Sequence, residues 1–124
     1  MRFSLITAVS VGAVAGALVR FGFQRWLNAS VLSPLGTLIV NVLGSILIGF
    51  LVGGFGHRTA GVWYYGMTAG FCGSLTTFSS ITMEVFEMVR LEEGLRAVAY
   101  VLTTFTLGIL GVGMGYWLGI KILR

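Results

Sequence analysis

GMTAGFCGSLTTFSSITME, residues 66–84, is the stretch that decides the fold, because glycines, hydroxyls and a carboxylate interrupt an otherwise apolar run there. In hydrocarbon, every polar group without a hydrogen-bonding partner costs several kcal/mol. Such a run is therefore stable in a membrane only where protein or a watery path satisfies its polar groups. Interruptions of this kind at membrane depth usually line the pathway of a transported ion or solute.

The composition of the whole chain is that of an integral membrane protein. Of its 124 residues, 56% are hydrophobic and 10% are charged, and a membrane-spanning helix needs about 20 mostly apolar residues. Four segments qualify, at about residues 3–23, 32–55, 62–89 and 95–120. The first continues past a cleavage-like motif, which favours a spanning helix over a signal peptide. The sequence predicts one all-α transmembrane domain, residues 1–124, with four transmembrane helices, the third broken near its middle.

Positive charges are divided evenly between the two ends of the predicted helices. With four passes, one side of the membrane receives Arg2, Arg58, Lys121 and Arg124, and the other receives Arg20, Arg25, Arg90 and Arg96. An imbalance of Lys and Arg in short loops normally sets the orientation of a membrane protein. Because the count here is four against four, we expect the chain to insert in both orientations.

Small residues recur at four-residue spacing, as in Gly12 and Gly16 or Gly66 and Gly70. Such pairs let helix backbones approach closely in lipid, so they predict a compact bundle. Four helices alone enclose little interior for a solute path, and a homodimer is therefore the economical expectation. Two copies inserted in opposite directions would have the symmetry of an inverted-repeat transporter.

Enzyme chemistry has no residues to support it. The sequence has no Ser/His/Asp set, no cluster of metal-ligating side chains and no phosphate-binding loop. His57 is the only histidine and stands beside Arg58 in a predicted loop, and Cys72 is the only cysteine, among small residues where packing is the expected role. The basic residues form no stripe with aromatics, so nucleic acid is not an expected partner.

Polar residues recur on single faces of two predicted helices. Thr37, Asn41 and Ser45 stand at four-residue intervals in the second segment, and Tyr100 and Thr104 do so in the fourth. Asn41 lies in an apolar run, where its amide is costly unless it is hydrogen-bonded. It would either hold an anion or join two helices, and the local sequence favours neither role. Tyr100 and Thr104 would extend a polar track or bond to neighbouring helices.

The third segment carries the residues that predict a break. Gly70 and Gly73 weaken the helix, and the neighbouring hydroxyls compete for backbone groups. A break would free carbonyls for a cation and N–H groups for an anion; the alternative is a continuous helix whose hydroxyls bond to their own turn. Phe78 offers a positive ring edge, although packing is the commoner role of phenylalanine. Glu84 is a functional candidate because intramembrane carboxylates are rare.

Together these motifs resemble those of the Fluc (CrcB-type) family of fluoride ion channels. GTLIVN at residues 36–41, GFCGSLTTFSS at 70–80 with Glu84 after it, and GALVR at 16–20 resemble the family's patterns in the same order. The resemblance implies an antiparallel dual-topology homodimer with two narrow pores, in agreement with the even charge count. It also implies a passive channel in the cell membrane, the inner membrane of a bacterium, through which cytoplasmic fluoride leaves.

The resemblance further implies roles for individual residues. A central structural sodium ion would be held by the backbone carbonyls of Gly73 and Thr76 in each subunit. Asn41 would donate a hydrogen bond to fluoride, and Phe78 would present its ring edge. The other implied positions form a polar track and a vestibule: Ser79, Ser80, Thr82, Glu84, Tyr100 and Thr104 in the track, and Arg20 and Thr37 in the vestibule.

Ile81 is where the sequence departs from the family pattern, which usually has a second phenylalanine at this position of the pore. Isoleucine supplies bulk and dryness but no polarised ring edge. We therefore expect a fluoride pore with one aromatic station and altered throughput.

Two rival classes compete with the channel. Small multidrug-type proton-coupled exporters are also short four-helix, dual-topology dimers, but they need a membrane-embedded carboxylate, usually in the first helix. Here the first segment has none, and Glu84 lies near a helix end. A purely structural membrane bundle would explain the glycine spacing, but it would leave the hydroxyls clustered around Gly73 unexplained.

Overall fold

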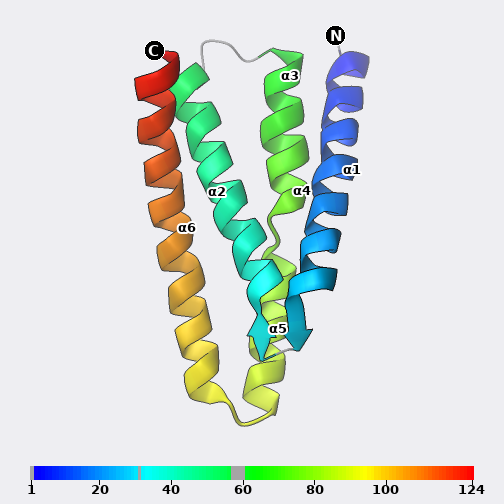
Figure 1. The fold of residues 1–124 in the computed structure, drawn as a ribbon. Helices are drawn as coiled ribbons and strands as arrows, with labels where there is room; N and C mark the ends of the chain where they lie inside the picture. The colour runs from blue at the N-terminus through cyan, green and yellow to red at the C-terminus, as the bar shows by residue number, and fades with distance from the viewer. Residues whose placement is uncertain (1, 31, 57–60) are drawn as a thin grey trace.

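The computed structural model describes residues 2–30, 32–56 and 61–124, and most of them are helical. His57 and Arg58 of the predicted loop lie outside these described residues. In chain order the elements are α1 (Arg2–Leu27), β1 (Asn28–Ser30), β2 (Ser33–Pro34), α2 (Leu35–Phe55), α3 (Val62–Tyr65), the π-helical segment η2 (Gly66–Cys72), α4 (Gly73–Leu75), α5 (Phe78–Arg90) and α6 (Gly94–Leu123). The start of α1 and the end of α6 lie at the same end of the bundle (Figure 1).

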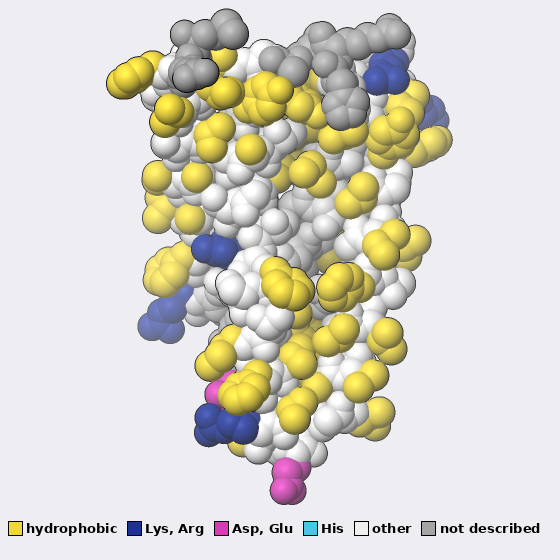
Figure 2. Space-filling model, turned by 180° about the vertical axis from the view of Figure 1, so that it is seen from behind, with side chains coloured by type: hydrophobic (Ala, Val, Ile, Leu, Met, Phe, Trp, Pro, Cys, Tyr) yellow, Lys and Arg dark blue, Asp and Glu magenta, His cyan; other side chains and the backbone are white. Residues whose placement is uncertain are grey.

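The long helices have the length and surface of membrane spans. Of the described helices, α1, α2 and α6 are each long and apolar enough to cross a membrane. The elements α3, η2, α4 and α5 are each too short to cross alone, and together they form one interrupted helix. Large apolar side chains such as Phe3 (87% exposed) and Ile109 (71%) point outward, and Figure 2 shows hydrophobic side chains along the length of one face. The chain is a multi-pass membrane protein.

A short antiparallel strand pair joins α1 to α2. Asn28 of β1 pairs with Pro34 of β2, and α2 therefore begins at Leu35, three residues later than predicted. The Asn28 side chain also reaches the start of this helix, where its Oδ1 accepts the N–H groups of Gly36 (2.7 Å) and Thr37 (3.3 Å). Because the first N–H groups of a helix have no partner within it, Asn28 stabilises the first turn of α2.

The prediction of a third helix broken near its middle is confirmed, but the break does not lie at the two glycines that were expected to weaken the helix. Gly70 lies within η2 and Gly73 begins α4, so both glycines are helical. The extended residues are Thr76 (φ −81°, ψ 152°) and Thr77 (φ −147°, ψ 116°). Glycine permits a break without requiring one, whereas Thr77 ends the helix because its N–H bonds to Asn41 and its side chain caps α5.

Glycines bring the helices into backbone contact, as their spacing predicted. A Cβ atom at Gly12 would overlap the Gly66 carbonyl oxygen, and one at Gly16 would overlap that of Phe71. In the same way, Gly115 of α6 lies directly against the backbone of α2. The short distances between α1 and η2, and between α2 and α6, therefore depend on the absence of side chains at these positions.

Gly115→Ala is expected to lower the free energy of unfolding by about 1–3 kcal/mol, the usual cost of overpacking. The added Cβ would overlap the Ile46 carbonyl and lie 2.9 Å from the Phe50 nitrogen. Gly113→Ala is the matched control on the same helix, because nothing lies within 4 Å of its Cβ position. Thermal unfolding in detergent compares the two variants, and equal melting temperatures would contradict the packing described.

Candidate functional site: a polar groove at the helix break

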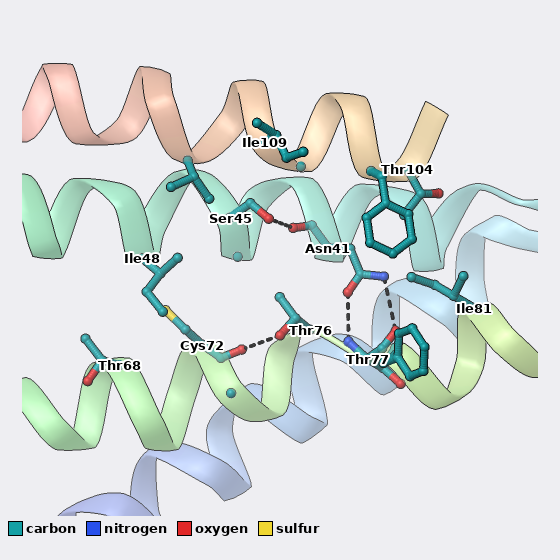
Figure 3. Close-up of a pocket in the computed structure, with 16 residues that line it drawn as sticks. Asn41, Ser45, Ile48, Thr68, Cys72, Thr76, Thr77, Ile81, Thr104 and Ile109 are labelled. Carbon is teal, nitrogen blue, oxygen red and sulfur yellow. Dashed lines mark hydrogen bonds between the residues drawn. The ribbon is translucent and has the colours of Figure 1, made fainter. Parts of the chain in front are cut away.

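A groove of about 430 Å³ opens between α2, α6 and the interrupted pass. Its polar lining comes from α2 (Asn41 and Ser45), from α6 (Thr104) and from the interrupted pass, with Thr68 on η2 and Thr76 and Thr77 at the break (Figure 3). The other described residues that line it are mostly apolar or glycine, and none of them carries a charged side chain. The groove therefore offers hydrogen-bonding groups without a fixed charge.

Asn41 stabilises the break with both the oxygen and the nitrogen of its side-chain amide. Its Oδ1 accepts the Thr77 N–H at 2.7 Å, and its Nδ2 donates to the Thr77 carbonyl at 3.4 Å (Figure 3). In a continuous α-helix the Thr77 N–H would bond to the Gly73 carbonyl, so this pairing releases that carbonyl. Asn41 thus joins two segments, and its second Nδ2 proton has no acceptor among the described residues.

A hydroxyl cluster at the start of α5 consists of Thr77, Ser79 and Ser80. Thr77 Oγ1 accepts the Ser80 N–H at 3.2 Å, which caps the helix, and donates to Ser80 Oγ at 3.1 Å. Ser79 Oγ lies 3.2 Å from Thr77 Oγ1. The partial positive charge of a helix N-terminus favours an anion nearby, and this cluster places several donors at that position.

A second cluster forms around Glu84, which receives hydrogen bonds from three other elements. The hydroxyls of Thr37 and Tyr100 each lie 2.6 Å from a carboxylate oxygen, and the Asn28 amino group lies 3.4 Å away. All three groups donate a hydrogen bond to Glu84. An ionised carboxylate needs such donors, because it can only accept hydrogen bonds. The structure therefore brings together Thr37, Glu84 and Tyr100, three of the predicted site residues.

Gln24 on α1 links the two clusters. Its Nε2 lies 3.0 Å from Thr37 Oγ1 and 3.1 Å from Ser80 Oγ. Gln24 and Asn28 were not among the site residues predicted from the sequence. The signal that would have found them is their four-residue spacing from Arg20, which places the polar residues at 20, 24 and 28 on one face of a helix.

The remaining candidates beside the groove differ in exposure. Phe78 is 68% exposed, whereas Ile81 is 7% exposed and packs in a core cluster with Met88 and Tyr100 while also lining the groove. The buried Thr104 hydroxyl has no hydrogen-bond partner among the described residues. Leaving a buried hydroxyl unsatisfied costs about 1–3 kcal/mol, so a ligand that accepts its proton would be stabilised there.

The other predicted positions lie at the edge of the groove or outside it. Gly73 and Thr76 line the groove beside the break. Thr82 is exposed, and its hydroxyl donates to the Ser79 carbonyl at 3.0 Å, so the structure does not bring it into either cluster. Arg20 is half-buried on α1 and is not part of the groove lining.

Most of the chain is similar in sequence to proteins of one family. Residues 7–116 match the family described as CrcB-like protein, Camphor Resistance (CrcB). The fluoride-specific ion channel FluC of Ignicoccus hospitalis is 33% identical over 94% of this chain and 95% of its own length. FluC 1 of Geobacillus kaustophilus is 38% identical (90% of this chain, 94% of the relative), and FluC of Pyrococcus abyssi is 40% identical (90% and 95%). Since the family match and these relatives both extend over most of the chain, it belongs to the CrcB family of membrane proteins.

Proposed function

We propose that the protein is a fluoride-selective passive ion channel, which lets fluoride leave the cytoplasm through two pores of an antiparallel homodimer. The observation that carries this proposal is the uncharged groove at the helix break, whose lining includes Asn41, Thr77 and Thr104. The names of the relatives, which are fluoride-specific ion channels, support the choice of ion. The protein carries out no chemical reaction in this proposal and would reside in the cytoplasmic membrane, the inner membrane of a bacterium.

The open side of the groove supports a second copy of the chain as the partner. Phe78, Phe105 and Ile109 line the groove, and they are 68%, 51% and 71% exposed. A pore for an ion needs a closed wall, because hydrocarbon cannot replace the water around an ion. The equal counts of Lys and Arg at the two ends support two copies inserted in opposite directions.

The groups in the groove suit a small, strongly hydrated anion. A dry, narrow pore must replace the water around fluoride with other hydrogen-bond donors. Asn41, the hydroxyls and the ring edge of Phe78 provide donors without a full positive charge that would trap the ion. Several weak stations let an ion enter and still leave. Ile81 would keep the pore dry but adds no ring edge, and the pore width would exclude larger halides.

The rest of the path is proposed from the two clusters. The hydroxyls of Ser79 and Ser80 would form the track beside Phe78, and it would continue to the Glu84 cluster with Thr37 and Tyr100. The exposed Thr82 would stand beside this track. Arg20 would draw anions into the vestibule, and Thr37 would lie near the inner end of that vestibule.

The backbone at the break fits a structural sodium ion. Because the Thr77 N–H bonds to Asn41, the Gly73 carbonyl loses its helical partner, and the Thr76 carbonyl lies in extended backbone. Freed carbonyls of interrupted helices are typical ligands of sodium. We propose that Gly73 and Thr76 of each copy hold one sodium ion at the centre of the dimer, where its charge would offset the carbonyl dipoles.

Complete replacement of sodium by N-methylglucamine is therefore expected to slow fluoride efflux about tenfold and to lower the melting temperature of the dimer, because a bound ion stabilises the folded state. Both effects should reverse when sodium is restored. Fluoride efflux and a melting temperature that stay constant from zero to high sodium would contradict the sodium site.

Thr104→Val is expected to slow fluoride efflux about tenfold while leaving stability unchanged or raising it by about 1 kcal/mol, because valine removes an unsatisfied buried hydroxyl. Thr103→Val is the matched control, since Thr103 is the preceding residue of α6 and is exposed. Efflux assays and thermal unfolding of both variants provide the measurement. Equal efflux from Thr104→Val and wild type would place the Thr104 hydroxyl outside the ion path.

The direct test of the proposed function is anion efflux from liposomes that contain the purified protein. Fluoride and chloride are followed with ion-selective electrodes, and potassium with valinomycin balances the charge. Rapid loss of fluoride without loss of chloride is the expected result. Equal loss of both anions, or no fluoride loss from verified dimers, would refute the proposal.

A further inference from the structure

Gln24 makes the connection between the hydroxyl cluster of α5 and the Glu84 cluster. It lies near the end of α1 and is part-buried, and its single amino group contacts α2 through Thr37 and α5 through Ser80. The two Nε2 protons match these two contacts in number. Gln24 is also the only glutamine of the chain.

The orientation of the Gln24 amide follows from the proton count at Thr37. The Thr37 hydroxyl has one proton, and it donates that proton to Glu84 across 2.6 Å. Thr37 can therefore only accept from Gln24, so the amino end of the Gln24 amide must face it. The same amino group then faces Ser80, whose oxygen accepts from Gln24 and also from Thr77.

The two hydrogen bonds that Ser80 accepts determine whether its hydroxyl acts as a donor or an acceptor toward a further group. A hydroxyl has two lone pairs and one proton, and both lone pairs of Ser80 are occupied by Gln24 and Thr77. Within the described part of the chain, the Ser80 proton has no acceptor. The Ser80 hydroxyl is therefore left to donate its proton in a hydrogen bond, and an anion is a group that accepts such a bond.

We propose that Gln24 is a positioning residue, which orients the Ser80 hydroxyl as a donor toward the ion and joins the two clusters into one continuous track. This inference rests on the proposed fluoride channel. Gln24 acts through Ser80 and Thr37 without contacting the ion. When the Gln24 amino group is removed, Ser80 regains a free lone pair, and its proton is no longer held toward the ion.

Gln24→Met tests this role, because methionine has a similar length and helix propensity but cannot donate. The expected result is fluoride efflux about tenfold slower than wild type, the typical effect of one lost hydrogen bond. Leu18→Met is the matched control on the same helix, at a position that is 65% exposed, and it should conduct like wild type. If Gln24→Met yields no folded dimer, Gln24→Glu replaces it, because a carboxylate keeps the shape of the side chain but accepts hydrogen bonds instead of donating them.

A double-mutant cycle with Ser80→Ala separates positioning from a general loss of packing. If Gln24 acts through Ser80, the double variant should conduct nearly as fast as Ser80→Ala alone, because coupled residues are not additive. If the double variant is instead slowed by the product of the two single effects, the inference is overturned. Wild-type efflux from Gln24→Met would also overturn it. A wild-type protein that releases no fluoride would instead refute the proposed function itself, and this inference with it.

Discussion

Asn41→Asp is expected to abolish fluoride efflux, with a rate at least about a hundredfold below wild type, because two effects act together. The carboxylate can still accept the Thr77 N–H, but it would also face the Thr77 carbonyl, to which Asn41 now donates at 3.4 Å. It would in addition place a negative charge in a groove whose described lining has none. An anion would then meet repulsion at the position where the proposal requires a donor.

The controls for Asn41→Asp distinguish loss of conduction from loss of folding. Leu43→Met changes the same helix at a side chain that is 46% exposed, and it should conduct like wild type. Size-exclusion chromatography should show the same dimer for both variants. Fluoride efflux from Asn41→Asp within threefold of wild type, a change of less than about 1 kcal/mol in the barrier, would remove Asn41 from the ion path.

Glu84→Leu is expected to cause the largest loss of stability, about 3–5 kcal/mol, because it leaves several buried donors without an acceptor. Thr37 is fully buried and Tyr100 is 8% exposed, and both donate to Glu84 at 2.6 Å. Asn28 would lose a third, longer contact. The elements β1, α2, α5 and α6 all meet at this carboxylate, so its removal should loosen one end of the bundle.

Glu87→Leu is the matched control for Glu84→Leu, because it changes the same residue type on the same helix. Among the described residues the Glu87 side chain pairs with Arg90 alone, at 3.2 Å, and the Arg90 side chain is 65% exposed. Surface ion pairs of this kind contribute about 0–1 kcal/mol. Thermal unfolding in detergent should therefore show a large shift for Glu84→Leu and little for Glu87→Leu. Similar shifts for both would mean that the three hydrogen bonds to Glu84 do not stabilise the fold.

The fold was predictable where it depends on composition and local spacing. The apolar runs predicted the membrane helices, and the glycine pairs predicted their close contacts, such as Gly12 against Gly66. Residues 66–84 also predicted a break near the middle of the third helix, but local spacing could not show at which residue the helix ends. The break lies at Thr77, whose N–H is taken by Asn41, 36 positions earlier in the chain. A local sequence pattern contains no information about a partner so distant.

Site residues were likewise predictable from the sequence only where the local pattern sets them apart. Thr37 and Asn41 stood out because polar residues are rare in an apolar helix and share one face. Gln24 lies near the end of α1, among residues where polar side chains are common, and its partner Ser80 is 56 positions away. Only the packing of α1 against α2 and α5 shows that its amide is part of the polar track.

The measurement that tests the central claim most directly is the reversal potential of fluoride current in a planar bilayer. A passive channel predicts about 59 mV for a tenfold fluoride gradient, the value for a singly charged ion, with no change when a pH gradient is added. A proton-coupled exporter would couple the two gradients. A reversal potential that moves with the pH gradient, or that follows chloride instead of fluoride, would contradict the account.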